Sequence, residues 1–179
     1  SDVYKRQDID VDVKQLAEDM TRVGNEYDSA SNLINATKLV IGQITECEPH
    51  PDSDHLHLCK VNIGTEVLDI VCGAPNARTG LKVIVALDGA VLPEKTIKKG
   101  MIRGQESNGM LCSIAELGLE HKFLKPEDSE GIAELGEDAE IGGDPIKYLQ
   151  MDDGVIDFEL TANRGDLLSI LGTVSYTHL

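Results

Sequence analysis

The basic side chains of this sequence are concentrated in one stretch, and they are the groups best suited to bind an anion. Residues 78–103 contain six cations against two acids, Asp88 and Glu94. The cations are Arg78, Lys82, Lys95, Lys98, Lys99 and Arg103. The last three follow one another closely, so we expect them to contact phosphate groups. The alternative is that the whole stretch is a solvated loop face.

The net charge of the chain limits what these cations can do. The formal charge is −16 at pH 7. Binding to nucleic acid depends largely on neutralising phosphates, and an acidic chain does not attract a polyanion by its overall field. Any nucleic-acid site must therefore be a local patch. Aromatic residues are absent between Leu33 and Lys122, so base stacking should be weak and binding sensitive to salt.

Histidine and cysteine side chains form a second candidate constellation. A zinc site would draw on Cys47, His50, His55, His57 and Cys59. Their spacing matches no zinc module, and structural zinc sites need closed sets of four ligands, so we predict no metal.

Catalytic chemistry has no clear candidate in the sequence. Cys72 has no base near it in sequence that could activate it as a nucleophile. The acidic residues between Glu127 and Asp144 lack the spacing of an EF-hand. All four cysteines are predicted to be buried, reduced thiols, and no catalytic residue is predicted.

Apolar periodicity predicts a mostly β protein with short helices. A helix is expected over residues 12–23 with Asp12 as its N-cap, followed by a loop over residues 29–32. Strands are expected over residues 39–47, 56–63, 66–72, 82–87, 89–92, 132–135 and 155–160. A change of phase within the second of these strands indicates a bulge. Further short helices are expected at residues 113–119, with Ser113 and Glu116 as a capping box, and after Asp166.

The order of these elements favours a barrel between two small arms. Short strands with Gly and Pro between them are typical of a small β-barrel rather than βαβ units. Neither arm is large enough to bury a core by itself. We therefore predict a β-barrel domain over residues 38–150, inserted into a small discontinuous α+β domain made of residues 8–37 and 151–173.

Three sequence blocks resemble the tRNA-binding module shared by several synthetases and free-standing tRNA-binding proteins. They are HPDSDHL at residues 50–56, IVCGAPN at 70–76, and a third block at 102–119 that contains IRG, SNGMLCS and ELGL. The flanks resemble bacterial phenylalanyl-tRNA synthetase β chains, in the helix before the barrel and in IDFELTANRGD at 156–166. Two residues differ from the family's usual pattern: Ala162 replaces a proline and His55 a lysine.

This resemblance implies an OB-fold barrel that binds tRNA. The residues predicted to bind tRNA are Lys82, Lys98, Lys99 and Arg103 of the basic stretch, together with Ser107, Asn108 and Met110 of the third block, which resembles the module's RNA-facing loop. The parent enzyme would charge tRNA(Phe) with phenylalanine, using ATP and Mg²⁺, in an α₂β₂ assembly with its α subunit. This chain would supply tRNA affinity and scaffolding, with no cofactor of its own. Two other functions stay open: a free-standing tRNA-binding protein, and a protein-interaction or chaperone module on the same fold.

The ends and the location of the chain complete the expectations. No apolar run approaches the roughly 20 residues that a membrane-spanning helix needs, and residues 1–7 do not begin a secretory signal. We expect a cytoplasmic protein without a membrane partner. Residues 1–7 and 174–179 do not resemble the family, and we expect them to be non-native ends.

Overall fold

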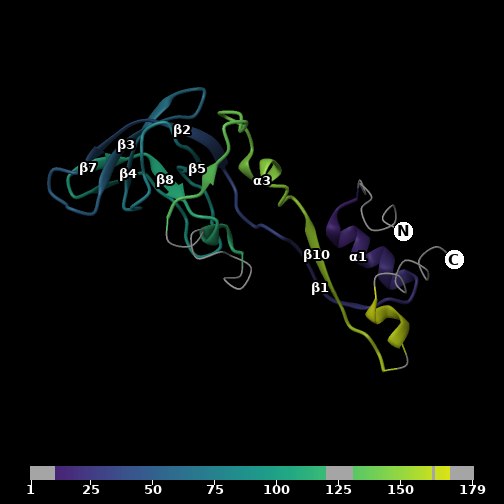
Figure 1. The fold of residues 1–179 in the computed structure, drawn as a ribbon. Coiled ribbons are helices and arrows are strands. Elements are labelled where there is room, and N and C mark those ends of the chain that lie inside the picture. The colour runs from purple at the N-terminus through teal and green to yellow at the C-terminus, as the bar shows by residue number, and fades with distance from the viewer. Residues whose placement is uncertain (1–10, 120–130, 163, 170–179) are drawn as a thin grey trace. The chain divides into compact units, whose positions relative to one another are not determined.

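The structure is a computed structural model that describes residues 11–119, 131–162 and 164–169 (Figure 1). The chain divides into two compact units. Unit 1 contains Ser1–Leu33 and Asp153–Leu179, and unit 2 contains Ile34–Asp152. The expected non-native ends, residues 1–7 and 174–179, lie outside the described residues.

Unit 2 is built on a curled antiparallel sheet (Figure 1). Its strands lie in the order β4-β3-β2-β5-β8, and β9 pairs with β5. Their bounds are β2 Leu39–Pro49, β3 His57–Asn62, β4 Val67–Cys72, β5 Lys82–Leu87, β8 Gly109–Cys112 and β9 Glu134–Leu135. A separate hairpin pairs β6 (Gly100–Ile102) with β7 (Gln105–Ser107). Its described residues also form two short helices, η2 (Ala115–Leu117) and α3 (Pro145–Tyr148).

Strand β5 is the centre of the core because both of its faces are buried. Val83 and Val85 belong to a cluster with residues of β2, β3 and β4, whereas Ile84 and Ala86 pack with Cys112 and Leu117 on the other side. This is why its sequence is a continuous apolar run rather than an alternating one. Apolar residues on both faces of one strand therefore join two layers of core.

Gly42 of β2 lies against side chains of both neighbouring strands, β3 and β5. A Cβ there would stand 2.7 Å from Val61 Cγ1 and 2.8 Å from Val85 Cγ2, so no larger residue fits without movement. The predicted bulge in the second strand is wrong in its position. The register shift lies in β2, between Ile44 and Glu46, while β3 runs in regular register with β4. A bulge in β2 changes which residues of the paired strand β3 face the core, so the change of apolar phase appears in the sequence of β3 although the extra residue lies in β2.

The described part of unit 1 contains a helix, a two-stranded sheet and a short 3₁₀ turn. Helix α1 (Val13–Arg22) has the predicted N-cap, since Asp12 Oδ2 accepts from the Lys14 N–H at 3.1 Å. Strand β1 (Tyr27–Asn32) pairs antiparallel with β10 (Gly154–Phe158). The predicted loop over residues 29–32 is therefore wrong. Pairing with a strand more than 120 positions away overrides the low strand propensity of Ser and Asn.

The remaining helical expectations are met in a shortened form. At residues 113–117 the predicted capping box is present: the Ser113 N–H donates to Glu116 Oε2 at 2.9 Å, and the Glu116 N–H donates to Ser113 Oγ at 3.2 Å. It encloses one 3₁₀ turn. The helix expected after Asp166 is a 3₁₀ turn, η4 (Gly165–Leu168), which begins before that residue and has Arg164 at its N-cap position. Residues 170–171 of the expected helix lie outside the described residues. No helix in the described ranges is long and apolar enough to cross a membrane.

Candidate nucleic-acid interface

The β6–β7 hairpin carries the last three cations of the basic stretch. Lys98 and Lys99 precede β6, and Arg103 occupies the turn with Gly104. All three are exposed. A three-residue strand spans roughly 10 Å, so the three charges lie along one short hairpin. The three cations, which are close in the sequence, are therefore also close in the structure.

The turn of this hairpin has an unusual residue in it. Arg103 has φ 48° and Gly104 has φ 81°, which is the type I′ geometry of two-residue hairpins. The first position of such a turn favours Asn, Asp or Gly, and a left-handed non-glycine residue costs on the order of 1 kcal/mol. The Arg103 guanidinium donates to the Asp52 carbonyl at 3.2 Å, tying the turn to the β2–β3 loop. Arginine at a strained position is a pointer to function rather than to local stability.

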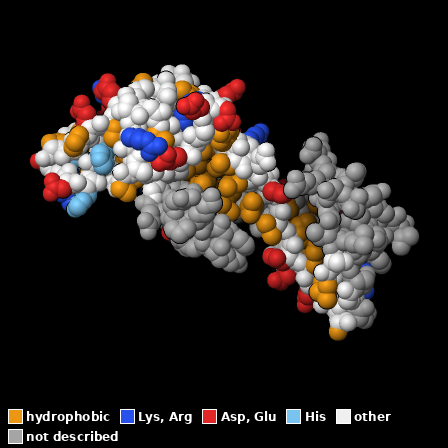
Figure 2. All heavy atoms as spheres, in the orientation of Figure 1, with side chains coloured by type: hydrophobic (Ala, Val, Ile, Leu, Met, Phe, Trp, Pro, Cys, Tyr) orange, Lys and Arg blue, Asp and Glu red, His pale blue; other side chains and the backbone are white. Residues whose placement is uncertain are grey.

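Ion pairing separates the hairpin cations from two other basic residues of the stretch 78–103. Arg78 pairs with Glu134 at 2.6 Å, and Lys95 pairs with Glu116 at 2.6 Å. Within the described ranges, Lys98, Lys99 and Arg103 take part in no ion pair. Residues 98–107 therefore keep three cations against one acid, Glu106. Figure 2 shows Lys and Arg side chains interspersed with Asp and Glu on the visible face of unit 2.

Lys82, a predicted binding residue, has a different environment from the hairpin cations. Its ammonium group donates to the carbonyls of Glu137 at 2.5 Å and Ala139 at 2.7 Å. These bonds fasten the chain after β9 to strand β5. Lys82 therefore lies apart from the hairpin cations and satisfies main-chain carbonyls with the donors that a phosphate would need.

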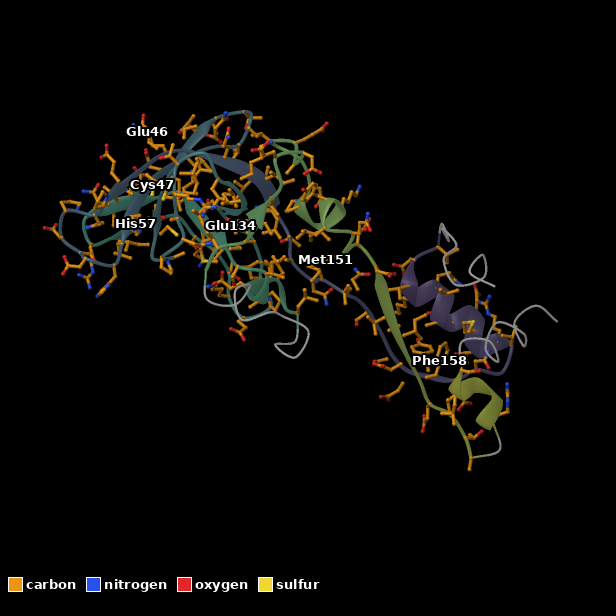
Figure 3. All side chains as sticks on the ribbon, in the orientation of Figure 1. Glu46, Cys47, His57, Glu134, Met151 and Phe158 are labelled. Carbon is orange, nitrogen blue, oxygen red and sulfur yellow. The ribbon has the colours of Figure 1, made fainter. Side chains whose placement is uncertain are left out.

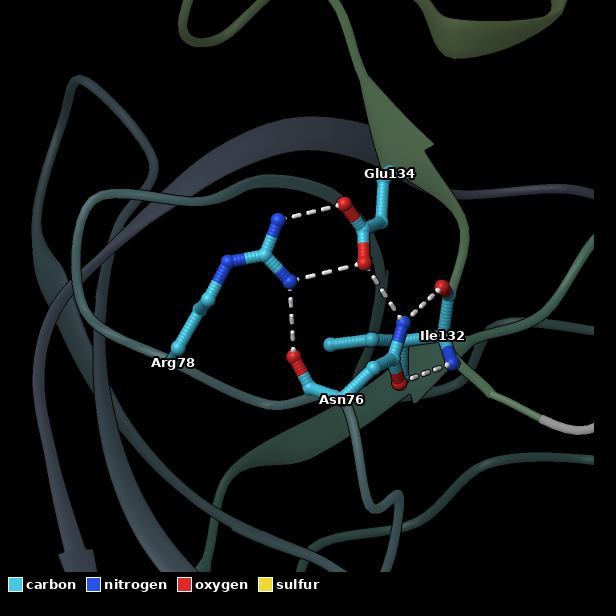
Figure 4. A network of polar contacts seen from close by, with 4 residues as sticks. All are labelled: Asn76, Arg78, Ile132 and Glu134. Carbon is cyan, nitrogen blue, oxygen red and sulfur yellow. Dashed lines mark hydrogen bonds and ion pairs between the residues drawn. The ribbon is translucent and has the colours of Figure 1, made fainter.

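Arg78 belongs to a polar network that holds residues 132–134 against the sheet (Figure 4). The side-chain amide of Asn76 donates to the Ile132 carbonyl at 2.9 Å and accepts from the Ile132 N–H at 3.0 Å, as a neighbouring strand would. Arg78 forms two bonds to Glu134, at 2.8 and 2.6 Å. The bonds from Arg78, and then that from Asn76, hold the pKa of Glu134 below its usual value. The network is structural, and it removes Arg78 from the pool of available cations.

Ser107 closes the curled sheet of unit 2. Its side chain is 4% exposed, and its Oγ accepts from the Val71 N–H at 3.1 Å and donates to the Gly109 carbonyl at 3.0 Å. The neighbouring Asn108 N–H donates to the Asp69 carbonyl at 2.8 Å. These bonds join β4 to the segment before β8 where the two edges meet. The hydroxyl of Ser107 is thus fully used inside the protein, while the half-buried Asn108 side chain remains partly accessible.

Met110 lies on β8, away from the hairpin cations. It is half-buried and lines an open groove of about 430 Å³ together with Cys72, Ser113 and the acidic residues Glu94 and Glu116. An acidic rim disfavours phosphate. The structure therefore brings Lys98, Lys99 and Arg103 together on the hairpin. Ser107 ends the same hairpin but is buried, and Lys82 and Met110 lie on other strands, β5 and β8.

The cysteines and histidines do not assemble into a site in the described part of the chain. There, no three His, Cys, Asp or Glu side chains are placed to hold a metal ion. Cys47 and His57 lie on the neighbouring strands β2 and β3 (Figure 3). Cys47 and Cys59 face each other with their sulfur atoms 3.8 Å apart. Burial raises the pKa of the Cys72 thiol and raises that of Cys112 to about 12, which keeps both protonated and unreactive.

Comparison with known proteins decides the family of the chain. The family described as "Putative tRNA binding domain" matches residues 39–144, well over half of the 179 residues. The chain belongs to this tRNA-binding family. The tRNA-binding domain so matched covers every strand from β2 to β9, together with the hairpin.

Curated relatives extend the match beyond the tRNA-binding domain. The chain is 47% identical over 168 residues to the phenylalanine--tRNA ligase beta subunit of Lactiplantibacillus plantarum, covering 92% of the chain and 21% of that protein. It is 49% identical over 166 residues to that of Idiomarina loihiensis, covering 91% and 20%. The chain therefore spans about a fifth of the length of these relatives. A solved MetRS related protein from Pyrococcus horikoshii matches 58% of the chain and 84% of its own length at 21% identity, with a TM-score of 0.43.

Sequence reasoning missed two features of the hairpin. Met101 and Ile102 were not singled out, yet both are exposed beside the cations. The left-handed turn was not recognised either. The Arg103-Gly104 pair between two short runs was the available signal, since a glycine in a two-residue connection is typical of hairpins.

Proposed function

We propose that this chain is the tRNA-binding part of a phenylalanine--tRNA ligase β subunit, and that it binds tRNA through the β6–β7 hairpin. The observation that carries the proposal is the hairpin itself, where three exposed cations stay outside the ion pairs that neutralise Arg78 and Lys95. Membership of a tRNA-binding family supplies the ligand class. Identity of 47% over 92% of the chain supports the parent protein.

The barrel is proposed to be of the OB type, inserted into a discontinuous α+β domain. The strand order β4-β3-β2-β5-β8, with β4 joined back to the β8 side through Ser107, supports a closed five-stranded path. The pairing of β1 with β10 supports a separate domain made from both ends of the described chain. OB-folds bind single-stranded nucleic acids with a cationic surface, which is the role proposed for the hairpin.

Binding would follow from the placement of charge. Each phosphate that a Lys or Arg neutralises releases condensed counterions, so affinity falls with salt by a slope of about 0.7–0.9 per contact. Three hairpin cations would contribute a slope of about 2. Because the rest of the chain is acidic, this local term must overcome repulsion from a formal charge of −16. Moderate affinity with a marked salt dependence is the expected behaviour.

The parent enzyme is proposed to join phenylalanine to tRNA(Phe) with ATP and Mg²⁺ in the cytoplasm, with an α subunit as its partner. The described residues of this chain bring together no set of side chains that fits a metal ion. The contribution proposed for this chain is to hold tRNA.

A filter-binding assay with a tRNA(Phe) transcript over 50–200 mM salt tests the proposal. The test variant replaces Lys98, Lys99 and Arg103 with Ala. The matched control replaces Lys14, Arg22 and Lys147, which are exposed cations outside the hairpin and give the same change in charge. We expect the slope of log Kd against log salt to fall by about 2 in the test variant and to change little in the control. Equal slopes in the two variants would reject the hairpin as the binding site.

A further inference from the structure

Two large apolar side chains are exposed in the middle of the cationic hairpin. Met101 is 68% exposed and Ile102 is 41% exposed. They are consecutive on β6, so they point to opposite faces of the hairpin. Glu106 is opposite Met101 and Gln105 is opposite Ile102, and neither partner covers them. The hairpin is therefore apolar on both faces near its tip, with Lys98 and Lys99 at one end and Arg103 at the other.

We propose that this tip inserts between two unpaired, unstacked bases of the RNA, and the inference rests on the proposed function. Met101 lies against one base or its ribose and Ile102, on the other face, against the next, while Lys98, Lys99 and Arg103 hold the phosphates on either side. Apolar wedges of this kind act between bases in nucleic-acid complexes, and proteins read RNA chiefly where its bases are unstacked. A narrow hairpin with one apolar side chain on each face fits between two such bases better than it fits the flat outside of a duplex.

The absence of aromatic residues from this part of the sequence strengthens the assignment. No Trp, Tyr or Phe occurs between Leu33 and Lys122, so the usual stacking platform of a barrel of this kind is missing from that stretch. Contact with base faces must then come from aliphatic or thioether groups. Met101 is well suited, because its side chain is flexible and polarizable and adapts to irregular surfaces.

Charge complementarity favours RNA over a protein partner for this tip. Every cation of the hairpin is free of ion pairs in the described structure, and the cations flank the apolar pair along the chain. A phosphate–base–phosphate unit of a nucleic acid presents the complementary pattern of charge, apolar surface and charge. Contact with another protein is the competing outcome, and the experiment distinguishes it.

The test variant replaces Met101 and Ile102 with Ser, and the matched control replaces Val67 and Val91 with Ser. These two valines are 55% and 47% exposed and lie in unit 2 outside the hairpin. Binding is measured with a tRNA(Phe) transcript and with a blunt-ended RNA duplex of the same number of phosphates, over a salt series. Sedimentation velocity reports the oligomeric state of each variant, and thermal melting confirms that each is folded.

We expect the M101S/I102S variant to bind tRNA about five- to thirtyfold more weakly at every salt concentration, with an unchanged salt slope. Its binding to the duplex and all binding by the control should match the unmodified chain. Unchanged tRNA affinity in M101S/I102S would overturn the inference and leave the proposed function intact. A change of oligomeric state without a change in tRNA affinity would overturn it in favour of a protein contact. Absence of tRNA binding by the unmodified chain would instead reject the proposed function.

Discussion

Replacing Ser107 with alanine tests how the curled sheet of unit 2 is closed. The hydroxyl is 4% exposed and is the acceptor for the Val71 N–H, at 3.1 Å. Alanine removes that acceptor and leaves the N–H without a partner where water has little access. An unsatisfied buried donor costs about 1–3 kcal/mol. We therefore expect S107A to lower the free energy of unfolding by about 2 kcal/mol.

Urea unfolding at 25 °C, followed by far-UV circular dichroism, measures this loss. With an m-value of about 2 kcal/mol per molar urea, the midpoint should fall by roughly 1 M. Hydrogen exchange at the Val71 amide should also become faster. The control is Ser31→Ala, which removes an exposed hydroxyl on β1 and should change stability by no more than about 0.5 kcal/mol.

The same variant separates a structural role for Ser107 from a role in tRNA contact. If the hydroxyl closes the sheet, S107A is less stable but binds tRNA normally at temperatures where it remains folded. A stability equal to that of the S31A control would refute the closure. Weakened tRNA affinity together with unchanged stability would support the direct contact that the sequence suggested.

Three further expectations follow from the contacts of unit 2. Gly109→Ala should destabilise the protein by about 1–3 kcal/mol in urea unfolding, since its Cβ would stand 2.7 Å from the Ala86 carbonyl oxygen, whereas Gly100→Ala, with no atom nearby, should not. The lowered pKa of Glu134 stabilises the folded chain above the ordinary carboxyl pKa, and this stabilisation is lost as pH falls through the folded-state pKa. The difference in unfolding free energy between the unmodified chain and Glu134→Gln should therefore shrink on acidification. A difference that stays constant with pH would contradict this role of Glu134. At pH 8 a disulfide reagent should label the half-exposed Cys47 first and reach Cys112, whose pKa burial raises to about 12, only on unfolding; equal rates would show that Cys112 is accessible.

Local sequence signals predicted the elements whose hydrogen bonds are local. The Asp12 cap and the Ser113–Glu116 capping box were both visible, because each joins residues two or three positions apart. The buried strand β5 was equally clear, since a run of apolar residues can satisfy two core layers without a partner being known. The cap hydrogen bonds join residues that are near one another in the sequence, and the burial of β5 needs apolar neighbours but not particular ones.

Features set by distant pairing could not be predicted in the same way. Strand β1 has the composition of a loop and becomes a strand because β10 pairs with it. Ser107 lies in a Ser-Asn-Gly sequence typical of a surface turn, and only its position opposite Val71 makes it a buried acceptor. Lys82 and Arg78 looked equivalent to the hairpin cations in sequence. Their partners Glu134, Glu137 and Ala139 lie 55 to 57 positions away, so the sequence did not show that these two cations are already engaged.

Lysine footprinting tests the central claim that tRNA binds the β6–β7 hairpin. The chain is acetylated with and without a tRNA(Phe) transcript at low salt, and modification at each lysine is measured by mass spectrometry. The account predicts several-fold protection of Lys98 and Lys99 on binding, with Lys14 and Lys147 unchanged. Protection of Lys14 or Lys147 with none at Lys98 and Lys99 would contradict it.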